Sequence, residues 1–337
     1  MSAVAQVGLG FQADKTAADY ERLASAAEHY GFQVLSVFGD LYFQPPLAAL
    51  LSMARATSTV RLGPACLNPF TVHPVEIAGQ IAVLDRASEG RAFLGLARGA
   101  WLGDLGIDQR DGLRALEEAV AVVAALLAGD TAGVKGARFS LPPGAALRGP
   151  APLRPRVPLL IGTWGQRLAA SAGRVADEVK VGGSANPAMV KVVRQWTEEA
   201  PPIPGRRVGI VMGAVTVVDI DGRRARARAR EEVAMYLDVV MALDPTFEPP
   251  PDLLDRLRQA LHRSGPTAAA ALVPDDVLDR FAFAGTPQRV AEHAIALLDA
   301  GADRVDFGTP HGLTDDVGVE LLGQQVLPVI REALGSR

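Results

Sequence analysis

The chain has one cysteine, four lysines and few aromatic residues among its 337 positions. The single thiol, Cys66, excludes an internal disulfide and is typical of a reducing compartment, so we expect a cytoplasmic protein. No apolar run reaches the roughly 20 residues of a membrane span, and the N-terminus lacks the basic and apolar segments of a signal peptide. Because the net charge is −4, we expect neither a nucleic acid nor a membrane as a partner.

Strand-like and helix-like segments alternate along the chain. Eight strands are expected, at Val4–Leu9, Val34–Phe38, Arg61–Cys66, Ala92–Leu96, Val157–Ile161, Glu178–Val181, Val208–Asp219 and Arg304–Phe307. Each is followed by a helical segment, and eight such units in series predict an α/β protein with a closed (β/α)8 TIM barrel. We expect one domain over residues 1–337, with insertions at about 129–156 and 244–274. The first insertion is expected to contain a short hairpin, and the helix after the seventh strand to run from about Arg223 to Ala242.

Two consecutive strands near mid-chain each run into a glycine-rich turn that opens a helix. The first turn is Gly162-Thr-Trp-Gly-Gln-Arg167 and the second is Gly182-Gly-Ser-Ala-Asn-Pro187. Such turns offer free backbone N–H groups and the positive end of a helix dipole, where phosphates commonly bind. With Arg167 and the Ser184 hydroxyl beside them, the two turns predict a phosphorylated cofactor.

The residues that follow the expected strands should form the functional rim of the barrel. They are mostly amides, aromatics and glycines, and Asp40 and His311 are the rim groups that we select as acid–base candidates. No Ser–His–Asp arrangement and no spacing typical of metal ligands occurs, so we expect no metal. A rim so poor in acids and bases suits a cofactor that carries the chemistry while the protein orients it.

Five segments resemble the luciferase-like flavin and deazaflavin oxidoreductases. They are Leu62-Gly-Pro-Ala-Cys-Leu-Asn-Pro-Phe-Thr-Val-His-Pro-Val-Glu-Ile77, Leu84-Asp-Arg-Ala-Ser-Glu-Gly-Arg91, Leu94-Gly-Leu-Ala-Arg-Gly99, Ile161-Gly-Thr-Trp-Gly165 and Val179-Lys-Val-Gly-Gly-Ser-Ala-Asn-Pro187. Within that superfamily the chain is most similar to the methylenetetrahydromethanopterin reductase branch, which uses the deazaflavin coenzyme F-420. The likeness runs from about Gly8 to Leu327 and is weakest across the two insertions.

The resemblance implies where a cofactor and its ring would lie. Its phosphate-binding positions carry over to Gly162, Thr163, Trp164, Gly165, Gln166, Arg167, Gly182, Gly183 and Ser184. It further implies a non-prolyl cis peptide at Ala65–Cys66 that presses on one face of the ring, with Asn68 near the ring edge and Asp40 beside it. A homodimer is common among such proteins and is expected here.

Three positions depart from the relatives that the chain resembles. Gly10 stands where the methanopterin reductases have a glutamate. Leu41 replaces a histidine, and Ala100 an acid, of the deazaflavin-dependent sugar-phosphate dehydrogenases. The usual proton-handling groups of both branches are therefore missing, and the substrate cannot be carried over from either.

Three functions remain open from the sequence. The first is hydride transfer between coenzyme F-420 and an electrophilic carbon or imine of a small organic substrate, pterin-like compounds included. The second is a monooxygenase that uses reduced FMN. The third is a barrel that binds a flavin-type cofactor without catalysis.

Overall fold

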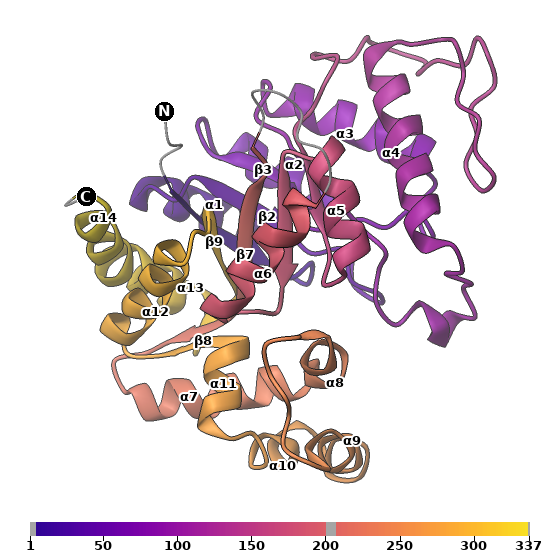
Figure 1. Ribbon diagram of the computed structural model, residues 1–337. Helices are drawn as coiled ribbons and strands as arrows, with labels where there is room; N and C mark the ends of the chain where they lie inside the picture. The colour runs from indigo at the N-terminus through magenta and orange to yellow at the C-terminus, as the bar shows by residue number, and fades with distance from the viewer. Residues whose placement is uncertain (1–4, 200–206, 336–337) are drawn as a thin grey trace.

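The computed structural model describes residues 5–199 and 207–335. Within them, parallel strands form a nearly closed barrel in the order β3-β2-β1-β9-β7-β6-β5-β4 (Figure 1). The strands, including β8 outside this path, are β1 (Gln6–Phe11), β2 (Val34–Val37), β3 (Arg61–Pro64), β4 (Leu94–Ala97), β5 (Leu159–Gly162), β6 (Glu178–Gly182), β7 (Gly209–Val218), β8 (Ala282–Gly285) and β9 (Arg304–Gly312). The predicted barrel is confirmed; the start of the first expected strand, at Val4, lies outside the described residues.

The barrel wall has one weak seam, between β3 and β4. The other neighbouring barrel strands share ladders of several paired residues, whereas β3 and β4 meet only through isolated bridges that pair Leu62 with Ala92 and Leu67 with Leu96. Four backbone hydrogen bonds, two at each bridge, span the seam. Residues 63–66 lie between the two bridges.

Helices cover the outside of the barrel (Figure 1). They are α1 (Ala17–Tyr30), α2 (Pro46–Arg55), α3 (Pro74–Ala87), α4 (Gly112–Ala128), α5 (Gln166–Val175), α6 (Pro187–Glu198), α7 (Gly222–Ala234), α8 (Leu237–Val240), α9 (Leu253–Ser264), α10 (Pro266–Ala270), α11 (Asp275–Phe281), α12 (Pro287–Asp299), α13 (Asp315–Leu321) and α14 (Leu327–Gly335). Short turns η1 (Leu102–Leu105), η2 (Met241–Leu243) and the π-helical η3 (Leu322–Val326) complete the set. Among the described residues, no helix combines the length and apolar character needed to cross a membrane.

The helix boundaries follow local chemistry. Thr16 and Asp19 form the reciprocal capping box expected before α1, and α3 begins at Pro74, whose missing N–H would have no helical partner in the first turn. In the first insertion, Val134 and Leu141 pair as an antiparallel bridge, which confirms the short hairpin.

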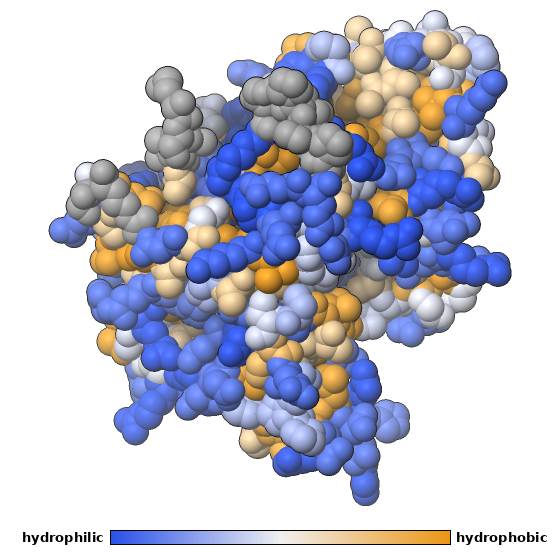
Figure 2. All heavy atoms as spheres, in the orientation of Figure 1, coloured by the Kyte–Doolittle hydropathy of each residue, from blue (hydrophilic) through white to orange (hydrophobic). Residues whose placement is uncertain are grey.

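Residues 244–274, the second expected insertion, lie within a larger lobe that projects from the barrel (Figure 1). We define this lobe as α7 to α11 with β8. Figure 2 shows the outline of the molecule indented between this lobe and the part that carries α4. The single helix expected to Ala242 is wrong, because α7 ends at Ala234 and a separate helix, α8, begins at Leu237. Between them, the Tyr236 hydroxyl donates to the Phe281 carbonyl. The lobe also adds the unexpected strand β8, which pairs with residues 215–218 of β7 above the point where β6 ends.

Candidate active site

The floor of the barrel mouth is formed at the end of β3. The Ala65–Cys66 peptide is cis, as the resemblance implied. The Cys66 thiol lies where side chains at two glycines would otherwise be. A Cβ added to Gly162 would lie 2.8 Å from the Cys66 Sγ, and one added to Gly95 would lie 3.3 Å from it. Gly162, expected to bind cofactor, thus also has a steric role toward the thiol. Burial raises the Cys66 pKa to about 12, so the group is neutral at physiological pH.

A buried charge network lies in the barrel interior, near Cys66. The Lys180 ammonium pairs with Asp306 at 2.7 Å, and the Arg304 guanidinium reaches Asp306 at 3.0 Å and Glu178 at 2.7 Å. Burial alone would raise the Asp306 pKa, but the Arg304 and Lys180 charges hold it below its ordinary value. Because β6 and β9 are not neighbours in the sheet, these side chains meet across the interior. Lys180 is therefore an internal ion-pair partner.

The first glycine-rich turn presents unpaired donors at the mouth. Gly165 is the N-cap of α5 and makes no side-chain cap, while its own N–H donates to the Thr163 Oγ1 at 2.9 Å. The first N–H groups of a helix have no helical partner, and here the first helical bond is made by Ala169 to the Gly165 carbonyl. The N–H groups of residues 166–168 are thus directed out of the helix end. The Arg167 side chain is exposed beside them and forms no ion pair within the described residues.

The second turn differs, and the expectation of free N–H groups there is wrong. The N–H groups of Gly183 and Ser184 both donate to the Gly213 carbonyl, at 2.6 and 3.0 Å. The Ser184 side chain is buried, and its hydroxyl accepts the Asn186 N–H at 3.3 Å. The pairing of β6 with β7 ends at Gly182 and Gly213, and beyond that point β8 pairs with residues 215–218 of β7. The segment after Gly182 therefore turns away from the sheet. Of the two glycines in this turn, Gly182 has open space where a Cβ would lie, whereas Gly183 does not.

Trp164 joins the two turns. Its indole N–H donates to the Gly182 carbonyl at 2.8 Å. Its half-buried ring packs against both the barrel core and the core of the lobe. The next residue but one, Gln166, donates its side-chain amide to Glu199 at 2.7 Å. These contacts fix the start of α5 relative to the mouth.

Asp40 lies on the rim after β2, where Gly39 packs so closely against the Cys66 carbonyl that a Cβ would be 2.6 Å from its oxygen. The Gln12 side-chain amide donates to the Asp40 Oδ2 at 3.1 Å. Asp40 is exposed to solvent at the rim. Burial by the surrounding protein raises the Asp40 pKa above its ordinary value, and the Gln12 hydrogen bond opposes this only partly.

Asn68, expected at the ring edge, is buried behind the seam. Its Oδ1 accepts the N–H groups of Phe70 and Thr71 at 3.1 and 3.0 Å. Gly99 passes so close that a Cβ would lie 3.1 Å from the Asn68 side-chain amide. The Asn68 Oδ1 is therefore used in the turn at residues 68–71, and the side-chain amide nitrogen is left as the group that can contact a cofactor ring. The role of Asn68 stays a prediction.

The missing glutamate at position 10 has a steric explanation. A Cβ on Gly10 would lie 2.7 Å from the Phe38 ring, which occupies the space of that side chain. Phe38 is half-buried at the end of β2, two residues before Asp40. The Phe38 ring thus fills the space beside Gly10 on this side of the mouth.

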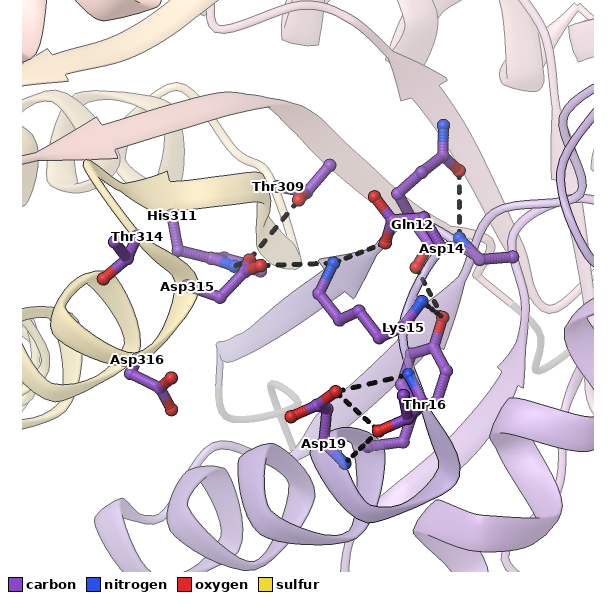
Figure 3. A network of polar contacts seen from close by, with 12 residues as sticks. Gln12, Asp14, Lys15, Thr16, Asp19, Thr309, His311, Thr314, Asp315 and Asp316 are labelled. Carbon is purple, nitrogen blue, oxygen red and sulfur yellow. Dashed lines mark hydrogen bonds and ion pairs between the residues drawn. The ribbon is translucent and has the colours of Figure 1, made fainter.

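His311 lies behind the rim. Its side chain has no exposed surface, its ring is 4.8 Å from that of Phe11, and its Nδ1 is 2.9 Å from an Asp315 carboxylate oxygen. Lys15 also contacts Asp315, at 3.1 Å, so the loop after β1 is tied to α13 (Figure 3). In this conformation His311 supports that loop and does not face solvent at the mouth.

Sequence reasoning missed two neighbours of the site, Gln12 and Phe38. Both belong to segments that follow strands, but no periodicity pairs Gln12 with a carboxylate 28 positions further along. Among the described residues no cluster of three or more potential metal ligands occurs.

A nearly closed parallel barrel with a cis peptide after β3 and a helix N-terminus after β5 is the fold of the luciferase-like TIM-barrel proteins. The chain belongs to the luciferase-like monooxygenase family, whose model matches residues 1–304. The superfamily expected from the sequence motifs is thereby confirmed.

Several relatives are F420-dependent enzymes. The chain is 26% identical to the 5,10-methylenetetrahydromethanopterin reductase of Methanopyrus kandleri, covering 98% of this chain and 100% of that one. It is also 26% identical to the F420-dependent glucose-6-phosphate dehydrogenase of Amycolatopsis mediterranei, over 86% and 84% of the two chains. The solved coenzyme F420-dependent tetrahydromethanopterin reductase from Methanopyrus kandleri superposes with a TM-score of 0.83, at 24% identity over 97% of this chain and 99% of that one. The predicted likeness to the methanopterin reductase branch is confirmed.

Proposed function

We propose that the protein is an oxidoreductase that transfers a hydride between coenzyme F-420 and a small organic substrate with an electrophilic carbon or imine. The observation that carries this proposal is the open N-terminus of α5, with Arg167 beside it, next to the Ala65–Cys66 floor. A phosphate suits this helix end, because the unpaired N–H groups and the helix dipole both favour an anion. The bound deazaflavin would supply the hydride.

The residues of the chain have separate tasks in this proposal. The first turn and Trp164 hold and orient the cofactor, while the floor at Cys66 supports one face of its ring. Hydride addition to a carbonyl or imine carbon leaves an oxygen or nitrogen that must take a proton. Asp40 is the solvent-accessible acid on this rim, and its pKa is raised above the ordinary aspartate value, so we assign it that proton.

The rim beside Asp40 favours a neutral substrate. Tyr42 and Phe43 follow Asp40 and are 81% and 45% exposed, and the Phe38 ring lies just before it. No lysine or arginine occurs between Phe38 and Arg55 to bind a phosphorylated sugar. We further propose a cytoplasmic homodimer, which light scattering of the purified protein would test through its mass.

Calorimetry with coenzyme F-420 and with FMN tests the cofactor. We expect tighter binding of F-420, whereas a tenfold preference for FMN would favour the monooxygenase alternative. Arg167→Ala should weaken F-420 binding at least about tenfold, since hydrogen bonds to charged groups contribute about 1.5–3 kcal/mol. Arg258→Ala, on the exposed side of α9, is the matched control.

A second variant tests the helix end itself. A Cβ on Gly165 would meet only the Thr163 Oγ1, at 3.6 Å, so Gly165→Val should fold normally while its side chain blocks the approach of a phosphate. Gly79→Val, where a Cβ meets nothing within 4 Å, is the control for the substitution. Unchanged F-420 affinity in both Arg167→Ala and Gly165→Val would place the phosphate elsewhere.

A further inference from the structure

The Gln12 side chain is held in one orientation. Its Oε1 accepts the N–H of Ala13 at 3.2 Å, and a backbone N–H can only donate, so the amide oxygen must face that side. The main chain is fixed as well, because the buried Tyr20 hydroxyl donates to the Gln12 carbonyl at 2.7 Å. In Figure 3 the Gln12 amide nitrogen accordingly projects away from the network around Lys15.

This orientation determines what Asp40 meets. Only the amide NH2 of Gln12 is left to face the carboxyl, and it donates to the Asp40 Oδ2 at 3.1 Å. An oxygen that accepts a hydrogen bond from an amide cannot direct its own proton along the same line. The carbonyl oxygen of a carboxylic acid is a better acceptor than its hydroxyl oxygen. The amide at Oδ2 therefore favours the protonated form of Asp40 that carries its proton on Oδ1.

We infer that Gln12 is a positioning residue for Asp40: its amide holds Oδ2 and directs the acidic proton to Oδ1. The inference rests on the proposed function, in which Asp40 gives a proton to the oxygen or nitrogen of the substrate while the carbon receives the hydride. After the transfer, Asp40 is left as a carboxylate, and the Gln12 N–H stabilises that product. Gln12 itself gains and loses no proton.

Few other titratable groups act on Asp40. Cys66, at the end of β3, is close enough for the Asp40 charge to raise its pKa, but at about 12 this thiol stays neutral. Lys180 of β6 acts on the same thiol from the interior and is paired with Asp306. Lys15, on the loop that carries Gln12, is paired with Asp14 and Asp315. Within the described residues Asp40 forms no ion pair, so Gln12 is its one direct polar partner.

The test of the Gln12 hydrogen bond itself needs no substrate. Protein labelled with 13C at the aspartate carboxyl carbons is titrated by NMR, and the Asp40 signal is identified by its loss in Asp40→Asn. Gln12→Met removes the donor that favours the carboxylate, so the Asp40 titration should move to higher pH. We expect its acid dissociation constant to fall by a factor of up to roughly three. Gln12→Glu should move it further, because a second carboxylate then faces Oδ2. Gln195→Met, on the exposed side of α6, should leave it unchanged.

The outcomes separate the two proposals. An Asp40 titration that stays in place in both Gln12 variants, with the protein folded, would overturn the role of Gln12. The cofactor proposal would not be affected by this result, because F-420 binding is measured separately. In turnover with reduced F-420 and acetone as a probe, loss of the high-pH limb in Asp40→Asn supports Asp40 as the donor. An unchanged limb would refute that assignment and, with it, the functional role of Gln12.

Discussion

Replacing Lys180 by methionine removes one charge from the interior of the barrel and leaves its partner behind. Lys180 and Asp306 are 6% and 2% exposed, and their charged atoms are 2.7 Å apart. Loss of one member of such a buried pair typically costs about 3–5 kcal/mol of unfolding free energy. Asp306 keeps its hydrogen bond to Arg304 at 3.0 Å, so we expect the lower end, about 3 kcal/mol.

Equilibrium denaturation in urea measures this difference through the transition midpoint. Lys191→Met makes the same chemical change on the exposed side of α6 and should cost less than about 1 kcal/mol. The double variant Lys180→Met with Asp306→Leu should lose less unfolding free energy than the two single variants lose together, because no unpaired carboxylate remains. If Lys180→Met behaved like Lys191→Met, the interior would be hydrated or otherwise compensated, and the reasoning from burial would be refuted.

Two further results are expected. Cys66, the only thiol, should react with iodoacetamide at pH 8 roughly a hundredfold or more slowly in the folded protein than in denaturant, because burial raises its pKa to about 12; equal rates would contradict that burial. The Glu28 carboxylate accepts N–H groups from residues 58–60, which outweigh its partial burial and lower its pKa to about 2. Its stabilisation is therefore present above the ordinary glutamate pKa and lost as the pH falls toward 2. Glu28→Gln should lower the unfolding free energy by about 1–2 kcal/mol at pH 7, allowing for solvent screening, and by much less at pH 3. A cost independent of pH would contradict the assignment.

The barrel could be predicted because its signals are local. Thr16 and Asp19 mark the start of one helix, Pro74 that of another, and the strands are short apolar runs between them. The structure of the lobe was harder to predict than that of the barrel. Ala282–Gly285 continues the apolar run of Phe281 and has the composition of a helix end, yet it forms β8 because β7 extends beyond β6 and offers it a partner.

The site divides in the same way. Its location after the strands follows from the alternation of elements, so Asp40, Cys66 and the first turn are brought to one end of the barrel. The direction of each side chain depends on contacts between distant segments. Ser184 is buried because β8 displaces its turn, and His311 is buried against Phe11 and Asp315. No pattern within either segment encodes those contacts.

In the part of the chain that the structure describes, the seam between β3 and β4 is the one place where the barrel is closed by two isolated bridges and not by a ladder. Around the rest of the circumference, a strand cannot shift without breaking backbone hydrogen bonds to a neighbour on either side. Within the described residues, positions 63–66 exchange none with β4, although Leu62 and Leu67 are held firmly at both ends of this stretch. Among the described residues, the gap in backbone hydrogen bonding around the wall therefore falls at the few residues that would lie against the cofactor ring.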